Sequence, residues 1–363
     1  MIYRVIGIMS GSSLDGLDIA FTEFTETGGK WTFDILNADC IEYTNEWCEQ
    51  LSKATMLPGM EYQLLHSAYG HYIGEQINQF IKVHHLQHKV HLIASHGHTT
   101  FHLPEKKMTA QLGDGAAIAA ATGLPVVSDL RALDIALGGQ GAPIVPIGEK
   151  LLFSGYDYFL NLGGIANISI NNDGKYIAFD ICAANRVLNM LAEETGAKYD
   201  EGGKIAALGK IHAALLKQLN ELEYYEKPYP KSLSNSFGTD IIYPIIKNRS
   251  MDIKDALGTY TEHICQQVTN CIRNNNLQIT HQKLLVTGGG AFNTFLIERL
   301  SALLNETNIE VIVPDEKIVM YKEAMIMGLI GILRWREEAN VLPSVTGASK
   351  ASIGGALWLG GGT

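Results

Sequence analysis

The chain has 363 residues, of which 28 are basic, 38 acidic and 46% hydrophobic, so its net charge is −10 at pH 7. This length predicts two domains, because one hydrophobic core seldom organises so many residues. The acidic balance without a block of Lys or Arg argues against nucleic-acid and anionic-membrane partners, and no apolar run approaches the roughly 20 residues of a membrane helix.

Hydrophobic periodicity and turn residues divide the first half into strands and helices. In chain order we expect strands at 3–8, 17–24 and 31–37, helices at 45–55 and 60–84, a buried strand at 90–95, a small helix at 116–122 and a strand at 125–128. The glycine-rich run 134–143 is the predicted interdomain hinge.

The second half repeats this order of three strands followed by helices. We expect strands at 157–162, 165–170, 176–180, 283–287 and 310–313, and helices at 184–196, 204–222, 239–247, 252–275, 293–304 and 319–339. The repetition indicates a structural duplication. The small-residue tail 344–358 is expected to return to the first domain, giving lobes of 1–130 plus about 340–363 and of 131–339.

Three apolar strands end in glycine turns, where backbone N–H groups can approach an anion closely. Two of these turns join strands, which suits the phosphates of a nucleotide, and the third leads into a helix. They contain Gly11, Ser12, Ser13, Leu14, Asp15, Gly16, Leu17 and Asp18; Gly163 and Gly164; and Gly288, Gly289 and Gly290. The alternatives are tight turns capped by Asp and close strand-to-helix packing.

Other phosphate motifs are absent from the sequence. It has no G-x-x-x-x-G-K-[ST] string, and no G-x-G-x-x-G follows the first strand. His96, His98 and His102 form an H-x-H-x-x-x-H string without a nearby acidic fourth ligand. We therefore favour polar cleft residues over a zinc site, and a metal-dependent hydrolase is the outside alternative.

Asp134 is the first candidate for a general base. It precedes a glycine-rich run that has no other ionisable group before Glu149. A lone carboxylate among glycines suits proton abstraction, and the structural alternative is an Asp that caps a turn.

Several strings together resemble the anhydro-N-acetylmuramic acid kinases. They run in order along nearly the whole chain: MSGSSLDGLD at 9–18, ASHGHT at 94–99, QLGDG at 111–115, SDLR at 128–131, DIALGGQGAP at 134–143, NLGGIANIS at 161–169, TGGGAFN at 287–293, KEA at 322–324 and LPSVTGA at 342–348. GGQGAP and NLGGIANIS are highly specific.

The resemblance implies an α/β fold with two lobes of the actin/hexokinase-like (ribonuclease H-like) type and an interdomain cleft. It implies an enzyme that uses ATP and Mg²⁺ to convert 1,6-anhydro-N-acetylmuramic acid into N-acetylmuramic acid 6-phosphate. Water opens the anhydro bridge and O6 is phosphorylated, which is a step of peptidoglycan recycling. Asp134 matches the catalytic base, and Asn293 joins the three glycine turns as the ATP site. His96, Thr99, Arg131 and Glu323 are the expected sugar-binding residues, the Mg²⁺ ligands are unassigned, and a homodimer is implied.

The chain departs from the family pattern at Ser12, at His98 and at Met327-Gly328, and also in two longer segments. Residues 179–185 read FDICAAN instead of the commoner FDTGPGN, and KSLSNSF at 231–237 replaces a stretch that usually carries Gly-Arg-Glu or similar. The alternatives are therefore a kinase for another anhydro- or amino sugar, and a catalytically silent ATP-binding regulator. The five cysteines include no C-x-x-C pair, and no basic leader precedes the first strand, so we expect reduced thiols in a cytoplasmic protein.

Overall fold

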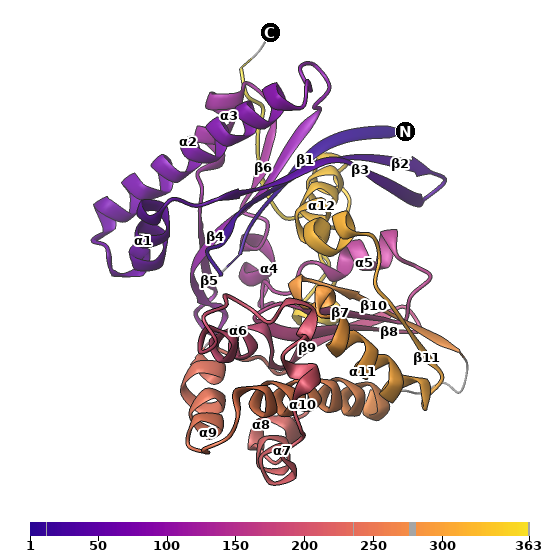
Figure 1. Ribbon diagram of the computed structural model, residues 1–363. Helices are drawn as coiled ribbons and strands as arrows, with labels where there is room; N and C mark the ends of the chain where they lie inside the picture. Colours follow the sequence, from indigo (N-terminus) through magenta and orange to yellow (C-terminus); the bar gives the residue numbers. More distant parts are fainter. Residues whose placement is uncertain (12, 235, 276–280, 362–363) are drawn as a thin grey trace. The chain divides into compact units, whose positions relative to one another are not determined.

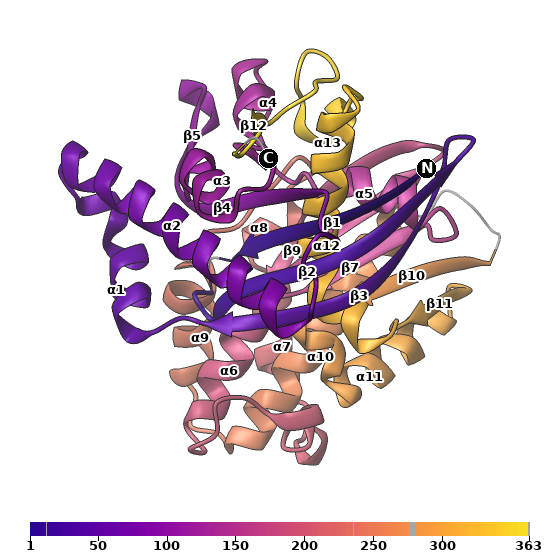
Figure 2. The same cartoon turned by 90° about the horizontal axis from the view of Figure 1, so that it is seen from above.

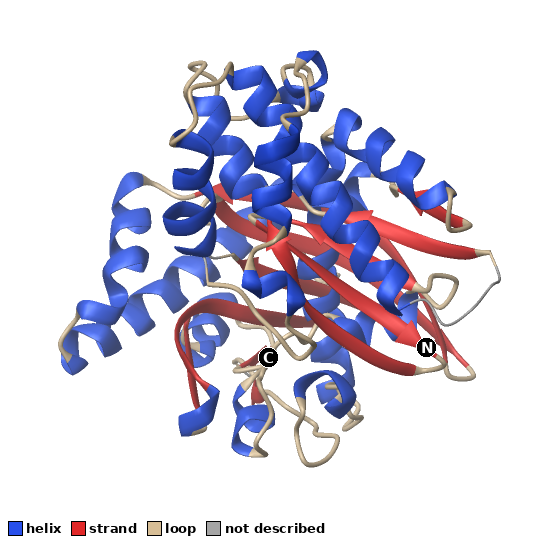
Figure 3. Ribbon diagram, turned by 90° about the horizontal axis from the view of Figure 1, so that it is seen from below, coloured by secondary structure: helices blue, strands red, loops and turns tan. Residues whose placement is uncertain are grey.

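The computed structural model describes residues 1–363 except 12, 235, 276–280 and 362–363. The chain forms two compact units. Unit 1 consists of Met1–Ser154 and Tyr321–Thr363, and unit 2 of Gly155–Met320. Figures 1 and 2 trace both units in sequence colours, and Figure 3 shows helices packed against the strands.

The elements of unit 1 follow the predicted order closely. They are β1 (Ile2–Ser10), β2 (Gly16–Thr27), β3 (Lys30–Glu42), α1 (Asn45–Lys53), α2 (Gly59–Val83), β4 (Leu92–Leu103), β5 (Met108–Leu112), α3 (Gly115–Thr122), β6 (Val126–Ser128), α4 (Ala132–Ala136), α5 (Pro146–Leu152), α13 (Pro343–Thr346) and β12 (Ala356–Trp358), together with α12 (Glu316–Trp335) from Tyr321 on.

Unit 2 contains β7 (Tyr158–Leu162), β8 (Ile165–Asn172), β9 (Lys175–Ala183), α6 (Asn185–Glu193), α7 (Ala213–Asn220), α8 (Glu223–Glu226), α9 (Tyr243–Lys247), α10 (Ile253–Asn275), β10 (Gln282–Thr287), α11 (Thr294–Asn305) and β11 (Ile309–Ile312). A π-helical turn, Phe237–Ile242, precedes α9.

The two sheets share one strand order, which confirms the predicted duplication. In unit 1, β3, β2 and β1 are antiparallel neighbours, and β4 and then β6 continue parallel to β1. In unit 2, β9, β8 and β7 are antiparallel, and β10 and then β11 continue parallel to β7. This is the predicted duplicated α/β fold of the actin/hexokinase type.

Alternation along β1 sends side chains to two helical layers of unit 1. Ile6 and Ile8 lie in a core with Tyr69 and Ile73 of α2. On the other face, α12 crosses β1 at Gly7, where a Cβ would overlap with the carbonyl of Ala324. Gly7 therefore lets the helix that carries Glu323 approach the first strand closely.

The core of unit 2 lies between its sheet and a long helix. Leu160 of β7 and Val286 of β10 are fully buried together with Leu257 and Ile264 of α10. These residues recur along α10 at helical spacing, so one face of the helix is committed to the core.

The unit boundaries differ from the predicted lobes. Residues 131–154 and 321–339 lie in unit 1, not in the second lobe. The reason is packing within unit 1: Lys322 pairs with Glu149, and Phe153 lies against the Phe33 ring. The predicted return of the tail is confirmed by β12, which pairs antiparallel with β6.

One predicted helix is wrong. Residues 204–222 contain a 3-10 turn, Ala206–Leu208, and only the short helix α7. Gly209 lies between the turn and α7. The residue there must be a glycine, because a Cβ would overlap with the Lys254 carbonyl at the start of α10. The strands β5 and β12 and the helices α4, α5, α8 and α13 were not predicted.

Candidate functional site

The first glycine turn joins β1 to β2 and is held by its own polar groups. The Ser13 hydroxyl donates to Asp15 Oδ1 over 2.7 Å, and the Leu14 N–H lies 3.5 Å from the Gly11 carbonyl oxygen. A Cβ at Gly16 would lie 2.6 Å from the Cys40 sulfur, so Gly16 serves strand packing, whereas Gly11 has more room. Leu17 is buried, and Ser12 lies outside the described residues.

Asp18, at the start of β2, is a carboxyl with a strongly shifted affinity for protons. Burial raises its pKa to about 6, and the charges of Asp15 and Glu323 add to the rise, while a hydrogen bond with Cys40 opposes it. Asp18 is therefore electrostatically coupled to Glu323 within unit 1.

Arg131 bonds directly to His96, another of the predicted sugar-binding residues. Its Nε donates to His96 Nε2 over 2.8 Å, and His96 Nδ1 donates to the Gly97 carbonyl over 2.8 Å. Burial and the neighbouring guanidinium lower the His96 pKa to about 3, so this imidazole is neutral at pH 7. Burial lowers the Arg131 pKa to about 10, which Glu323 partly offsets.

Glu323, which is partly buried, joins these residues in one group of polar and charged side chains. Burial raises its pKa, and the charges of Lys322 and Arg131 oppose that rise. His96, Arg131, Glu323 and Asp18 are thus brought together in unit 1. Thr99 lies farther along β4, where Gln111 Nε2 approaches its hydroxyl at 3.4 Å.

The histidines do not gather around a metal site. His98 bonds to the Ser10 hydroxyl at 3.0 Å, and burial lowers its pKa to about 4. Within the described part of the chain, no group of three or more His, Cys, Asp or Glu side chains is arranged to hold a metal ion.

Asp134 is buried at 1% exposure, and each of its two carboxylate oxygens accepts a hydrogen bond. Oδ2 accepts the Gly141 N–H over 2.8 Å, and Oδ1 accepts the Thr346 hydroxyl over 2.8 Å. This is the geometry of the alternative considered above, a carboxylate that holds a turn. The catalytic role of Asp134 stays a prediction.

In unit 2, the turn between β7 and β8 has room for a Cβ at both of its glycines. A Cβ at Gly163 or Gly164 would meet its nearest neighbour only at 3.5 or 3.8 Å, so packing within the protein does not require glycine there. The turn is fixed from the other side, because the Ala184 and Asn185 N–H groups donate to the Gly164 and Gly163 carbonyls. Bare backbone with room beside it suits a bound anion.

Arg186, which the sequence analysis missed, adds a positive charge at this turn. Its Nε is buried without a hydrogen-bond partner in the described part of the structure. A Cβ at Gly164 would lie 3.9 Å from that nitrogen. A buried donor without a partner is costly, and a phosphate oxygen would satisfy it. Its position directly after the FDICAAN string is the signal that could have found it.

The third glycine run is divided between packing and open space. Gly288 has φ +80° and a Cβ there would overlap with Asn161, and a Cβ at Gly290 would lie 2.6 Å from Leu162 Cβ. Gly289 has room. Asn293 caps α11, since its Oδ1 accepts the Leu296 N–H over 3.0 Å. Close packing, the alternative given above, therefore describes Gly288 and Gly290.

Asp180 of β9 is a carboxylate that the sequence analysis did not select. Its Oδ2 accepts the Leu233 N–H over 2.8 Å, and burial raises its pKa. Asp180 pairs with Asn167 near the beginning of β8, the strand that follows the Gly163–Gly164 turn. Its other oxygen has no hydrogen-bond partner among the described residues, and Asp180 is only partly buried, whereas Asp134 is 1% exposed.

The duplicated sheets and their glycine turns define a member of the actin/hexokinase-like class of proteins. Comparison with known proteins gives the family. The family model described as anhydro-N-acetylmuramic acid kinase matches residues 3–360. The chain belongs to the anhydro-N-acetylmuramic acid kinase family.

Relatives of that name align with the chain over nearly its whole length. The relative from Hydrogenovibrio crunogenus is 32% identical over 97% of both chains, and that from Francisella tularensis subsp. novicida is 34% identical over 97% of both. The relative from Aliivibrio fischeri is 33% identical over 97% of this chain and 98% of its own. A solved ROK family glucokinase from Streptomyces griseus covers 91% of this chain and 99% of its own at 11% identity, with a TM-score of 0.41.

Proposed function

We propose that this protein is an ATP-dependent kinase that opens 1,6-anhydro-N-acetylmuramic acid with water and phosphorylates its O6, giving N-acetylmuramic acid 6-phosphate. The observation that carries the proposal is the family match over residues 3–360. The glycine turns and the charged group in unit 1 support it.

In the proposed reaction, water attacks C1 while the C1–O6 bond breaks, and a carboxylate takes the proton from that water. The released O6 then accepts the γ-phosphoryl group and ADP leaves. Bridge opening develops positive charge at C1, which nearby carboxylates stabilise. Because O6 becomes the nucleophile as it leaves, no separate acid is needed to protonate it.

In unit 2, we assign phosphate binding to the turn at Gly163 and Gly164 and to Arg186. The N–H groups of this turn and the guanidinium would bind and orient the phosphates. The role of the β1–β2 turn of unit 1 in ATP binding stays a prediction from the sequence. Mg²⁺, when bound with ATP, would neutralise developing phosphoryl charge, and Asp15, beside the turn hydroxyl of Ser13, is a carboxylate that fits it.

Sugar binding is assigned to Arg131, His96 and Glu323. Two carboxylates are candidates for the base. The family resemblance implies Asp134 as the base. The raised pKa of Asp180 and its carboxylate oxygen without a hydrogen-bond partner among the described residues support Asp180. A base must also be reached by the water that it deprotonates, and the partial exposure of Asp180 against the burial of Asp134 supports Asp180.

The described residues include no helix long and apolar enough to cross a bilayer. A cytoplasmic location and a homodimer are part of the proposal.

The test is mass analysis of the product formed from Mg-ATP and the anhydro sugar in ¹⁸O-water. One added phosphate and one ¹⁸O atom are the expected result. ATP binding without product would reject this sugar and favour another anhydro- or amino sugar, or a silent ATP-binding protein.

A further inference from the structure

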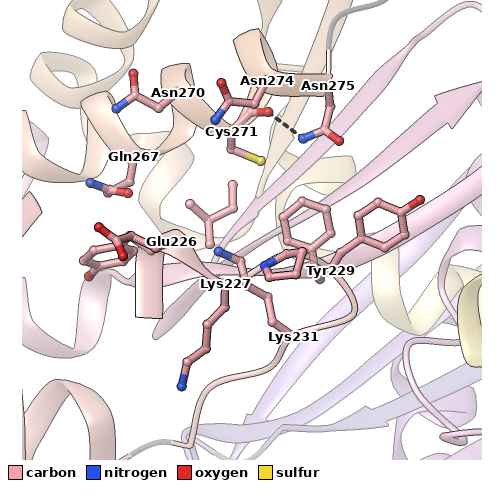
Figure 4. Close-up of a pocket in the computed structure, with 13 residues that line it drawn as sticks. Glu226, Lys227, Tyr229, Lys231, Gln267, Asn270, Cys271, Asn274 and Asn275 are labelled. Atoms are coloured by element: carbon pink, nitrogen blue, oxygen red, sulfur yellow. Dashed lines mark hydrogen bonds between the residues drawn. The ribbon is translucent and has the colours of Figure 1, made fainter. Parts of the chain in front are cut away.

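A pocket of about 280 Å³ lies in unit 2. Figure 4 shows it between β9, the segment after α8 and one face of α10. Its volume is slightly below the range of small-molecule sites, which is about 300 to 1,000 Å³. It therefore fits a ligand of about one sugar ring.

The pocket is separate from the candidate active site. Phe179 and Ile181 of β9 line it, but Asp180 between them does not, because its carboxylate is directed to the Leu233 N–H. The glycine turns and Arg186 are not among its lining residues either. A ligand here would leave those groups untouched.

Lys231 supplies a positive charge inside the pocket. Its Nζ lies 3.4 Å from the Tyr224 carbonyl oxygen and 4.7 Å from the centre of the Tyr224 ring. Burial lowers its pKa, so the ammonium is incompletely compensated by these neutral groups. An anionic ligand group would supply the missing partner.

Amide side chains of α10 line the same pocket as this ammonium. Asn270 and Asn274 are one helical turn apart, and Figure 4 shows both above the pocket. Neither amide side chain bonds to another of the described residues, whereas Gln267 Nε2 is already bonded to Asn220. These two amides and the exposed carboxylate of Glu226 can form hydrogen bonds with the hydroxyl groups of a ligand.

An aromatic pair forms the remaining wall. The rings of Phe179 and Tyr229 are stacked, with centroids 5.9 Å apart and an interplanar angle of 11°. Phe179 is buried, whereas Tyr229 is 49% exposed. An exposed aromatic ring offers an apolar face for the C–H groups of a sugar.

We propose that this pocket binds a monosaccharide that carries one carboxylate or phosphate group. Lys231 holds the anionic group, the amides of α10 and Glu226 hold hydroxyls, and the Tyr229 ring supports the sugar ring. The site joins the two longer segments that depart from the family pattern, since the Asp180 N–H donates to the Lys231 carbonyl over 3.3 Å. The inference does not depend on the proposed kinase reaction.

The test is calorimetric titration of the full chain with D-glucuronate, D-glucose 6-phosphate and neutral D-glucose. We expect one molecule of a charged sugar per chain, bound about tenfold more tightly than glucose. The two charged probes distinguish a carboxylate ligand from a phosphate ligand. Charged sugars that bind no more tightly than glucose would overturn the proposal.

Lys231→Met should weaken the charged probes about tenfold. Lys217→Met is the control: it removes the same charge from unit 2, but Lys217 is exposed, pairs with Glu221 at 3.7 Å and does not line the pocket. Should Lys231→Met fail to fold, the double variant Asn270→Leu, Asn274→Leu removes both amides from the pocket at two exposed positions. Unchanged binding of the charged sugars by that double variant overturns the assignment.

Discussion

Lys322 donates to Glu149 over 2.9 Å in an ion pair whose two side chains are each 3% exposed. The pair joins α12 to α5 directly beside Glu323. Glu149 Oε2 has no hydrogen-bond partner among the described residues, so Lys322 is the main compensation of this buried charge. The pair fixes the helix that presents Glu323 to Arg131.

Lys322→Met is expected to lower the free energy of unfolding by about 3–5 kcal/mol, because it leaves the Glu149 carboxylate buried and unpaired. Urea unfolding measures the loss. The double variant Glu149→Gln, Lys322→Met should recover much of it. A double variant as unstable as the single one would show that the charge of Glu149 is not the cause.

Asp134→Asn and Asp180→Asn should separate a structural carboxylate from a catalytic one. Asn at 134 replaces one of two bonded oxygens, which should cost about 1–3 kcal/mol of stability together with activity. Asn at 180 should lower kcat about 10²- to 10⁴-fold with little loss of stability. Melting temperature and kcat are measured together. If Asp134→Asn loses turnover at unchanged stability and Asp180→Asn keeps turnover, Asp134 is the base.

Gly163→Val is expected to weaken ATP binding about tenfold or more, because its side chain fills the space beside the turn amides. Gly288→Ala should instead lower the melting temperature, since φ is +80° there and its Cβ overlaps with Asn161. Gly155→Val is the control, because nothing lies within 4 Å of a Cβ at that position. ATP affinity that survives in Gly163→Val would make Gly163 only a turn residue.

Arg186→Met should weaken ATP binding and leave adenosine binding unchanged, because only the nucleotide offers phosphate oxygens to the guanidinium. The expected loss for ATP is about tenfold or more, measured by calorimetry. Arg249→Met, a variant of an arginine that bonds to Gln218, is the control. Equal losses for ATP and adenosine would assign Arg186 to the folding of the turn.

The raised pKa of Asp18 predicts how stability changes with pH. Its pKa is about 6 in the folded chain against 3.8 when unperturbed, so folding favours the protonated form. This contribution is fully present below about pH 4 and is lost as the pH rises through about 6. Urea unfolding from pH 4 to 7.5 should show that Asp18→Asn removes this part of the pH dependence, whereas Asp34→Asn, on the exposed side of β3, retains it. An unchanged profile in Asp18→Asn contradicts the shift.

The sequence predicted most strands of both halves and their succession along the chain, because alternation and glycine turns are local signals. It did not predict the unit boundary, since the contact of Phe153 with Phe33 and the pairing of Lys322 with Glu149 join distant segments. For the same reason, only the structure distinguishes glycines that close packing requires from glycines that have room for a side chain. Gly163 and Gly288 look alike in sequence, but only Gly288 is constrained by neighbouring atoms.

The hydroxyl of Thr346 reaches Asp134 across 212 positions of the chain, and β12 completes the edge of the sheet beside β6. Unit 2 is one continuous stretch of chain inserted into unit 1. During synthesis, unit 2 can therefore fold as soon as it has left the ribosome. Unit 1 can complete its fold only after residues 321–363 have been synthesised, and until then apolar faces of its strands are uncovered.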